Sequence, residues 1–396
     1  MKEILTPLRH FQKLIPPKHY FSLLLINGST IKNIIYQWDT KNLTNITSLN
    51  VSVYNKMHIP KGLKTYQNKY IISRYTGVGR WIAVAHYSSP YFTLLEWKDE
   101  TQLIKKAEYD LGATAYGVAF SPNGQYIVCG TYGHPNVHLL KWDGTSLTKV
   151  AEYTLPNASS HSCYSVDFSP DNQYIVCGYS NFYGNYPYVS ILKWDGTSLT
   201  ELDNYNVGGN CYGVHFSPNG QYIACAHIYS PCITLLKWDG ISLTKVAEYD
   251  LGGNSECKLK FSPDGQYIAA GHTNSPYFGL LQWDGSTLTK VADYTLPSTC
   301  FGVAFSPDGQ YIACAHSGSP YFTLLKWDGT NLTKVAENNL PVDYPSKACS
   351  FDISGQYLVV TYTHTPYLSI FKWDGTNLTR LDDYTLPGES WDCEFY

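Results

Sequence analysis

Aspartate and histidine are the residues of this chain whose types could do chemistry, and both recur at matching positions. Carboxylates serve in acid–base and glycosidic chemistry, and histidines bind metals and transfer protons. The aspartates that follow a tryptophan and precede a glycine are Asp143, Asp195, Asp239, Asp284, Asp328 and Asp374. The histidines that share one position, six residues after an Arg or Gln, are His86, His227, His272 and His316. Because a catalytic site must be singular, we interpret residues that recur in this way as residues that every repeat needs for its fold.

Metal and nucleophile chemistry receive no support from the spacing of these residues. Metal ligands converge within about 2 Å of one point, whereas equivalent positions on separate repeats lie apart. The sequence also lacks the HExxH, GxSxG, P-loop and dinucleotide-binding patterns. Most of its 11 cysteines fall at matching positions, which favours buried thiols in a reducing compartment. We therefore predict no catalytic residues, no metal site and no cofactor, and a protein that is not an enzyme.

The elements that hold these residues are copies of one unit. A Trp that ends an apolar run recurs eight times, mostly about 45 residues apart, which is the period of four-stranded propeller blades. The cleanest copy spans residues 300–341 and divides into four β-rich runs separated by turn residues. Ser306-Pro307-Asp308-Gly309 joins the first two runs, and Asp328-Gly329 joins the last two. Four antiparallel strands repeated radially predict an all-β protein with a β-propeller fold.

The number of blades follows from counting the first strands of the units. The last of them, residues 389–396, stops at the chain end without its remaining three strands. Residues 20–51 supply second, third and fourth strands with no first strand before them. Pairing the C-terminal strand with this incomplete N-terminal blade closes the ring and removes two exposed sheet edges. We therefore predict eight blades over residues 20–396, with seven blades as the alternative because the first two units are degenerate, and an N-terminal arm of residues 1–19.

Two features of the repeat resemble known families. Trp-Asp at a strand end and Ser-Pro-Asp/Asn-Gly between the first two strands resemble WD-repeat and related SPDG-type propellers, over about residues 20–396. Residues 85–93 and 315–323 read AHYSSPYFT and AHSGSPYFT, and they resemble propeller repeats of bacteriophage and prophage proteins. The second resemblance implies a protein associated with a virion or a phage tail.

Places where the repeat is broken are where we expect a binding site. The unit from Gln173 to Trp194 carries a four-residue insertion that is rich in aromatic and amide side chains. The loops that enter this unit and the last full unit are also extended, and all three extensions open on one face. Tyr and Asn on loops suit the binding of proteins and glycans, although the insertion could instead pack on its own blade. The predicted contact patch consists of Asn181, Phe182, Tyr183, Asn185, Tyr186, His161 and Tyr344.

Charge and composition limit the partners of the protein. The formal net charge is −4, and the charged residues are spread along the repeats, so the sequence has no basic stripe for nucleic acid. The first 20 residues contain no uninterrupted apolar stretch of membrane-span or signal-peptide length. We therefore expect neither a nucleic-acid partner nor membrane insertion.

Three functional hypotheses follow. The first is a non-enzymatic structural or adhesion component of a phage tail or capsid, made in the host cytoplasm. It would bind other virion proteins through residues 1–19, and a host surface protein or glycan through its loops. The second hypothesis is a cytoplasmic interaction scaffold of WD-repeat type, and the third is a propeller hydrolase or lactonase.

Overall fold

The computed structural model describes residues 80–156, 161–180, 187–252, 258–339 and 344–396, together with six backbone strands before residue 80. The chain divides into two compact units, Met1–Gly79 and Arg80–Tyr396. The described residues form strands and turns and contain no helix. Consequently, none of them lies in a helix that could span a membrane.

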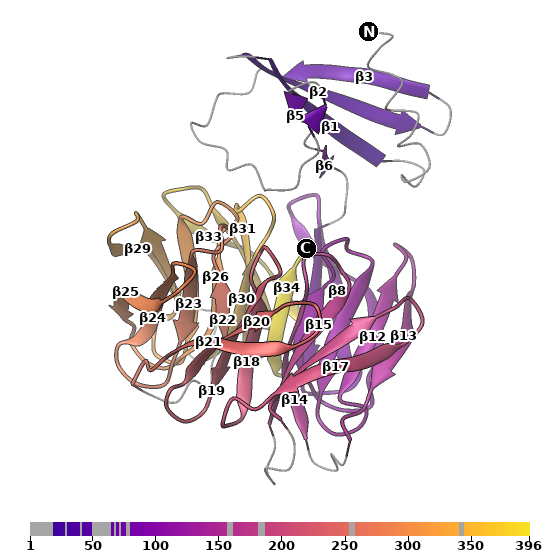
Figure 1. The fold of residues 1–396 in the computed structure, drawn as a ribbon. Helices are drawn as coiled ribbons and strands as arrows, with labels where there is room; N and C mark the ends of the chain where they lie inside the picture. Colours follow the sequence, from indigo (N-terminus) through magenta and orange to yellow (C-terminus); the bar gives the residue numbers. More distant parts are fainter. Residues whose placement is uncertain are drawn as a thin grey trace. The chain divides into compact units, whose positions relative to one another are not determined.

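The first unit contains a four-stranded antiparallel sheet of its own (Figure 1). Its strand order is β3 (Asn42–Leu49), β2 (Thr30–Asp39), β1 (His19–Asn27), β6 (Ser73–Thr76). Strands β4 (Thr65–Tyr66) and β5 (Lys69–Tyr70) form a separate pair. Residues 1–18, which make up nearly all of the predicted arm, lie outside the described residues.

The second unit is a ring of seven four-stranded antiparallel blades (Figure 1). The inner strands are β34 (Ser390–Phe395), β10 (Ala115–Phe120), β14 (Ser162–Phe168), β18 (Cys211–Phe216), β22 (Leu259–Phe261), β26 (Cys300–Phe305) and β30 (Ser346–Phe351). The second strands are β7 (Arg80–His86), β11 (Tyr126–Thr131), β15 (Tyr174–Ser180), β19 (Tyr222–His227), β23 (Tyr267–Gly271), β27 (Tyr311–His316) and β31 (Tyr357–Tyr362). The third strands are β8 (Tyr91–Lys98), β12 (Val137–Trp142), β16 (Val189–Trp194), β20 (Ile233–Trp238), β24 (Tyr277–Trp283), β28 (Tyr321–Trp327) and β32 (Tyr367–Trp373). The outer strands are β9 (Gln102–Asp110), β13 (Leu147–Tyr153), β17 (Leu199–Tyr205), β21 (Leu243–Tyr249), β25 (Leu288–Thr295), β29 (Leu332–Asn339) and β33 (Leu378–Thr385).

The prediction of eight blades is wrong, and the seven-blade alternative is confirmed. The C-terminal strand does complete an N-terminal blade, but its partner is β7, with Cys393 opposite Val84. The strand before β7 is not available to that blade, because β6 pairs with β1. In place of a ring that begins at residue 20, the ring therefore begins at Arg80, and the strands of residues 19–49 form the separate sheet.

The turns form as their residues predict. Ser306 Oγ donates to Asp308 Oδ1 (2.5 Å) and accepts from the Tyr311 N–H (2.9 Å), and Gly309 has a φ of 72° between them. The Asp328 carboxylate accepts the N–H groups of Thr330 (2.8 Å) and Asn331 (2.7 Å). These bonds fix tight hairpins through side-chain oxygens. These contacts support the interpretation that the recurring aspartates serve the fold of each repeat.

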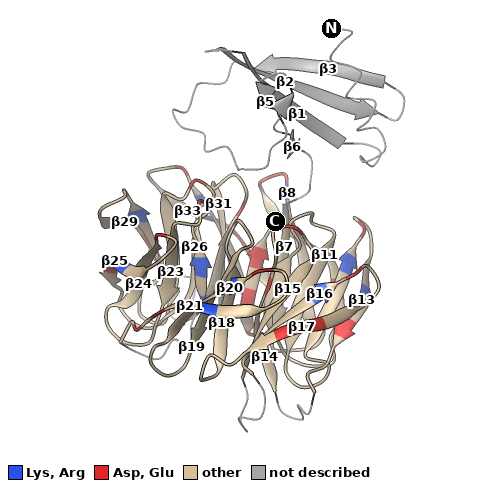
Figure 2. Ribbon diagram, in the orientation of Figure 1, with Lys and Arg blue, Asp and Glu red and all other residues tan. Residues whose placement is uncertain are grey.

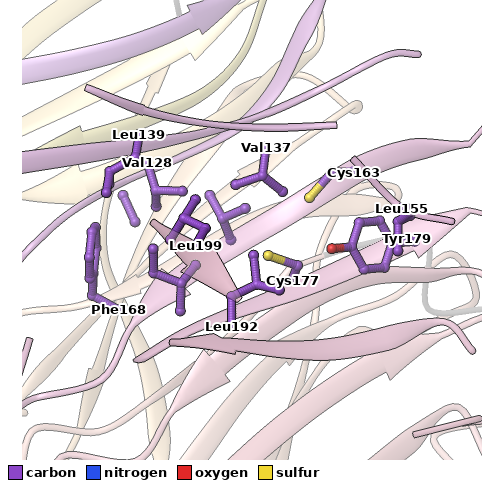
Figure 3. Close-up of a cluster of buried hydrophobic side chains, with 13 residues drawn as sticks. Val128, Val137, Leu139, Leu155, Cys163, Phe168, Cys177, Tyr179, Leu192 and Leu199 are labelled. Atoms are coloured by element: carbon purple, nitrogen blue, oxygen red, sulfur yellow. The ribbon is translucent and has the colours of Figure 1, made fainter. Parts of the chain in front are cut away.

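The core lies between neighbouring blades. Figure 3 shows one such cluster, which includes Val137 and Leu139 of β12 and Cys177 and Tyr179 of β15, a strand of the neighbouring blade. The Trp that ends each third strand also contacts an aromatic ring of a neighbouring blade, as Trp327 does with Tyr267 at 5.6 Å and an interplanar angle of 73°. Edge-to-face aromatic pairs of this kind add about 0.5–1.5 kcal/mol beyond area burial. The repeated Trp therefore helps to hold each blade against its neighbour.

Candidate functional site

Two of the seven residues of the predicted contact patch are among the residues that the structure describes. Asn181, Phe182, Tyr183, Asn185 and Tyr186 lie outside the described residues. The other two members, His161 and Tyr344, lie in the loops that enter the first strands of their blades.

These two residues differ in their exposure. The His161 side chain is only 3% exposed, so it cannot contribute to a surface contact. Tyr344 is 43% exposed and stacks on His364, with ring centroids 3.4 Å apart. Of the described members of the predicted patch, only Tyr344 presents a surface.

The recurring histidines are internal parts of their blades. His86 Nε2 lies 3.0 Å from Thr93 Oγ1, and His316 Nε2 lies 2.9 Å from Thr323 Oγ1. Burial lowers the pKa of both histidines to about 4, so they are neutral at physiological pH. Among the described residues, no group of three or more His, Cys, Asp or Glu is placed to hold a metal ion.

A singular polar cluster lies instead on the inner strands, at the residue before the terminal Phe. The type of side chain at this position differs in almost every blade, whereas the Phe that follows it is the same in all seven. The residues there are Ala119, Asp167, His215, Lys260, Ala304, Ser350 and Glu394. Figure 2 marks the charged residues of the ring, with Lys and Arg in blue and Asp and Glu in red. Two positions earlier in the repeat, Lys258 and Asp392 replace the small residues of the other blades. We call Asp167, His215, Lys258, Lys260, Asp392 and Glu394 the channel cluster.

The cluster satisfies backbone groups that face the central channel. An inner strand has no further strand beside it, so its channel-side N–H groups need other acceptors. Asp167 Oδ2 accepts the Phe216 N–H of the next blade (2.7 Å), and Ser350 Oγ accepts the Phe395 N–H (3.0 Å). Glu394 accepts the N–H of Phe120 in the same way. The side chain of one blade thus caps the inner strand of the next.

One ion pair crosses the channel. Lys258 immediately precedes β22 and pairs with Asp392 of β34, on the opposite side of the ring. Asp392 Oδ2 also accepts the Val118 N–H at 3.1 Å. The two charges therefore neutralise each other in the middle of the channel.

Burial and neighbouring charges shift the pKa values of Asp167, Glu394 and Lys260. Burial raises the pKa of Asp167 to about 6 and that of Glu394 to about 7, and in both cases the charge of Lys260 opposes the rise. Burial works against the ammonium charge of Lys260, but the carboxylates of the cluster outweigh it and raise the pKa of this lysine. Lys260 therefore stays protonated, and both acids titrate near neutral pH.

His215 is held as a neutral imidazole beside Asp167. Burial, aided by the Lys260 charge, lowers the pKa of His215 well below its usual value. Its Nδ1 accepts the Phe261 N–H at 3.2 Å, which leaves the ring proton on Nε2. Nε2 lies 3.7 Å from Asp167 Oδ2. The imidazole thus directs an N–H towards that carboxylate.

A cavity in the channel reaches the cluster. Its walls include Lys258, Lys260, Asp392 and Glu394 together with Ser165 and Ser350. Glu394, the next-to-last residue of β34, is therefore partly exposed to this cavity. Acids with pKa values near 7 beside a fixed ammonium group can exchange protons with a bound molecule and stabilise a developing negative charge.

Sequence reasoning missed this cluster because its search for singular residues was confined to loops. The signal was present within the strands, since Asp167, His215, Lys260 and Glu394 occupy one position of the repeat and share no common type. Comparing the blades column by column would have identified it.

Known proteins resemble the chain in fold. A family model of the WD domain, G-beta repeat, matches residues 151–182, and no curated protein matches the chain. A putative 6-phosphogluconolactonase from Bacteroides fragilis has a TM-score of 0.67 at 15% identity, over 80% of this chain and 98% of that chain. The periplasmic gluconolactonase PpgL of Pseudomonas aeruginosa gives 0.67 at 15% identity, over 80% and 99%. The β-propeller domain of Cps50 (Swd1) from Myceliophteria thermophila gives 0.55 at 12% identity, over 71% and 88%.

These matches correct two expectations. The prediction that the chain is not an enzyme is contradicted, because solved structures that match over almost their whole length are lactonases by description. Nothing in the matches supports the expected link to bacteriophages. At identities of 12–15% the likeness establishes the fold alone. The chain is a seven-bladed β-propeller with WD-like repeats.

Proposed function

We propose that this protein is a hydrolase of small cyclic esters and that the channel cluster is its active site. The observation that carries the proposal is Glu394, a carboxyl group with its pKa raised to about 7, in a cavity shared with the Lys260 ammonium. A general base works best when its pKa lies near the operating pH. The lactonases among the proteins of similar fold support the same class of reaction.

In the proposed reaction Glu394 acts as the general base and Lys260 stabilises negative charge. Glu394, when ionised, takes a proton from a water molecule as the water oxygen forms a bond to the lactone carbonyl carbon. Lys260 stabilises the negative charge that develops on the carbonyl oxygen. The ring C–O bond then breaks, and Glu394 returns its proton to the leaving alkoxide. The product is an open-chain hydroxy acid.

The need to cap backbone groups does not account for these residue types. Ser350 caps its neighbouring strand with a neutral hydroxyl, and two blades carry alanine at the same position. The fold therefore requires neither a carboxyl group at position 394 nor a lysine at position 260. Burying ionisable groups is costly, and perturbed groups in a cavity are typical of active sites.

The test is an assay of the hydrolysis of gluconolactone and 6-phosphogluconolactone. The rate is measured by proton release, after subtraction of the spontaneous rate. Glu394→Gln keeps the shape and the hydrogen bond from Phe120, and we expect a loss of about 100- to 10,000-fold. Asp328→Asn removes an exposed carboxylate from a hairpin outside the cavity, and we expect it to keep most activity. Turnover by Glu394→Gln at the wild-type rate would refute the assignment, and absence of lactone hydrolysis by the wild type would refute the function.

A second function, partner binding, is favoured by a separate observation. Tyr87, Tyr132 and Tyr229 are 56%, 51% and 64% exposed and follow the second strands of three blades, on the face where Tyr344 lies. Exposed tyrosines in loops supply rigid contact area for a protein partner. A virion protein remains the partner class that the repeat sequence suggests. Proteomics of the assemblies that co-purify with the wild type and with a Tyr87→Ser/Tyr229→Ser variant tests this function. Equal recovery of a partner with the wild type and with the variant would contradict it.

A further inference from the structure

The walls of the channel cavity carry charges of both signs. Lys258 and Lys260 supply two positive charges, and Asp392 and Glu394 supply two negative ones. Asp167 is not a wall residue, but its charge acts on Lys260 and on Glu394. Above pH 7, where Glu394 has lost its proton, the negative charges of this set therefore exceed the positive charges by one.

Both lysines of the walls are already matched by carboxylates. Lys258 pairs with Asp392, and these side chains are only 17% and 12% exposed, so water screens the pair weakly. Burial works against the Lys260 charge, but the carboxylates, of which Asp167 has the largest effect, outweigh it and raise the pKa of this lysine. Neither wall lysine is therefore an uncompensated cation.

The polar groups of the walls suit the hydroxyl groups of a ligand. Ser165 Oγ accepts the Val214 N–H at 3.1 Å, and Ser350 Oγ accepts the Phe395 N–H at 3.0 Å. Since both serine oxygens act as acceptors in these bonds, their O–H groups remain donors. An ionised carboxylate accepts hydrogen bonds from hydroxyl groups. The walls thus offer both donors and acceptors to an uncharged molecule with several hydroxyl groups.

A phosphate group finds no such match. A phosphate monoester carries a charge of roughly −1.5 to −2 at pH 7, and like charges brought together at a binding site repel one another strongly. A phosphate could pair with a wall lysine only by displacing the carboxylate that already neutralises it. If it took the Lys260 ammonium, that group would no longer stabilise the carbonyl oxygen of the lactone. The cavity therefore opposes a phosphorylated substrate in binding and in turnover.

We propose that the channel cavity selects uncharged, hydroxylated lactones and rejects phosphorylated ones, and that Asp167 is a positioning residue that acts through the charge of Lys260. The inference rests on the proposed function for the site and for the ring of the substrate, but selection by charge requires no turnover. A gluconolactonase and a putative 6-phosphogluconolactonase both occur among the proteins of similar fold. The fold therefore does not decide between the two substrate classes, whereas the charges of the cavity do.

The experiment is titration calorimetry of the full chain at pH 8 with gluconolactam and 6-phosphogluconolactam. In these probes a ring amide replaces the ester, so binding is measured without ester hydrolysis. We expect the uncharged lactam to bind at least about tenfold more tightly than the phosphorylated one. Equal affinities, tighter binding of the phosphorylated lactam, or no binding of either lactam would overturn the proposal.

The lactone assay separates this proposal from the proposed function. Preference for the uncharged lactam without hydrolysis of any lactone would refute the hydrolase and leave the selection by charge. Hydrolysis of lactones together with tighter binding of the phosphorylated lactam would refute the selection and leave the hydrolase.

Two variants test the source of the selection. Asp167→Asn removes one negative charge and keeps an oxygen for the Phe216 N–H, which Asp167 now accepts at 2.7 Å. We expect it to bind the phosphorylated lactam more tightly, so that the preference for the uncharged lactam falls at least about fivefold. Asp195→Asn is the matched control, because it removes a carboxylate from an exposed hairpin of the same blade, and it should keep the wild-type preference. The same preference in Asp167→Asn as in the wild type would overturn the role of Asp167, and circular dichroism melting of each variant confirms that the ring is folded.

Discussion

Replacing Glu394 by glutamine should change how the stability of the ring depends on pH. In the folded protein the pKa of Glu394 is raised from 4.5 to about 7. Between these values the unfolded chain loses the proton while the folded chain keeps it, so the free energy of unfolding falls as the pH rises. Below this range both states are protonated, and above it both are ionised. A shift of this size corresponds to about 3 kcal/mol.

Glutamine cannot ionise, so the variant should lack this penalty. We expect the free energy of unfolding of Glu394→Gln, relative to wild type, to rise by about 3 kcal/mol between pH 4.5 and pH 8. Urea unfolding followed by tryptophan fluorescence at pH 4.5, 6 and 8 measures the difference. Ser350→Ala, which removes no ionisable group, should differ from wild type by the same amount at each pH. A Glu394→Gln difference that stays constant with pH, or that falls, would refute the reasoning on the channel cluster.

Three further outcomes follow from the contacts of the ring. Gly309→Ala should lower the free energy of unfolding by about 1 kcal/mol, because its φ of 72° is unfavourable for a residue with a Cβ; equal stability in urea would contradict this. Thr323→Val should cost about 1–3 kcal/mol by leaving buried His316 Nε2 without its partner, and a neutral effect would show that the bond contributes nothing. Removing residues 390–396 should expose to hydrogen exchange the N–H groups of β7 that face β34, such as that of Ala83; unchanged protection of Ala83 would show that the blade does not need this strand.

The fold was largely predictable because its repeat is local. Turn residues such as Asp308-Gly309 and the Trp at each third-strand end carry the four-strand pattern on their own, without reference to other blades. The blade count was not predictable in the same way. Residues 19–49 contain apolar runs and a Trp-Asp pair like those of the blades. Only the long-range pairing of β6 with β1 and of β34 with β7 decides which strands join the ring.

The site was predicted less well, for a physical reason. Loop extensions are visible in a sequence, whereas the channel cluster exists only because the ring brings inner strands of distant residues to one axis. Lys258 and Asp392 are 134 residues apart and form an ion pair. Nothing in the local pattern indicates that they meet.

The pH dependence of lactone hydrolysis, expressed as kcat/KM, tests the proposed active site most directly. For the wild type we predict a rise with a midpoint near pH 7, where Glu394 loses its proton and becomes a base. Lys260 holds the pKa of Glu394 down, so Lys260→Met should move the midpoint to higher pH as well as lower the rate. A profile that is flat between pH 5 and pH 9 after subtraction of the spontaneous reaction, or a midpoint that does not move in Lys260→Met, would contradict the account.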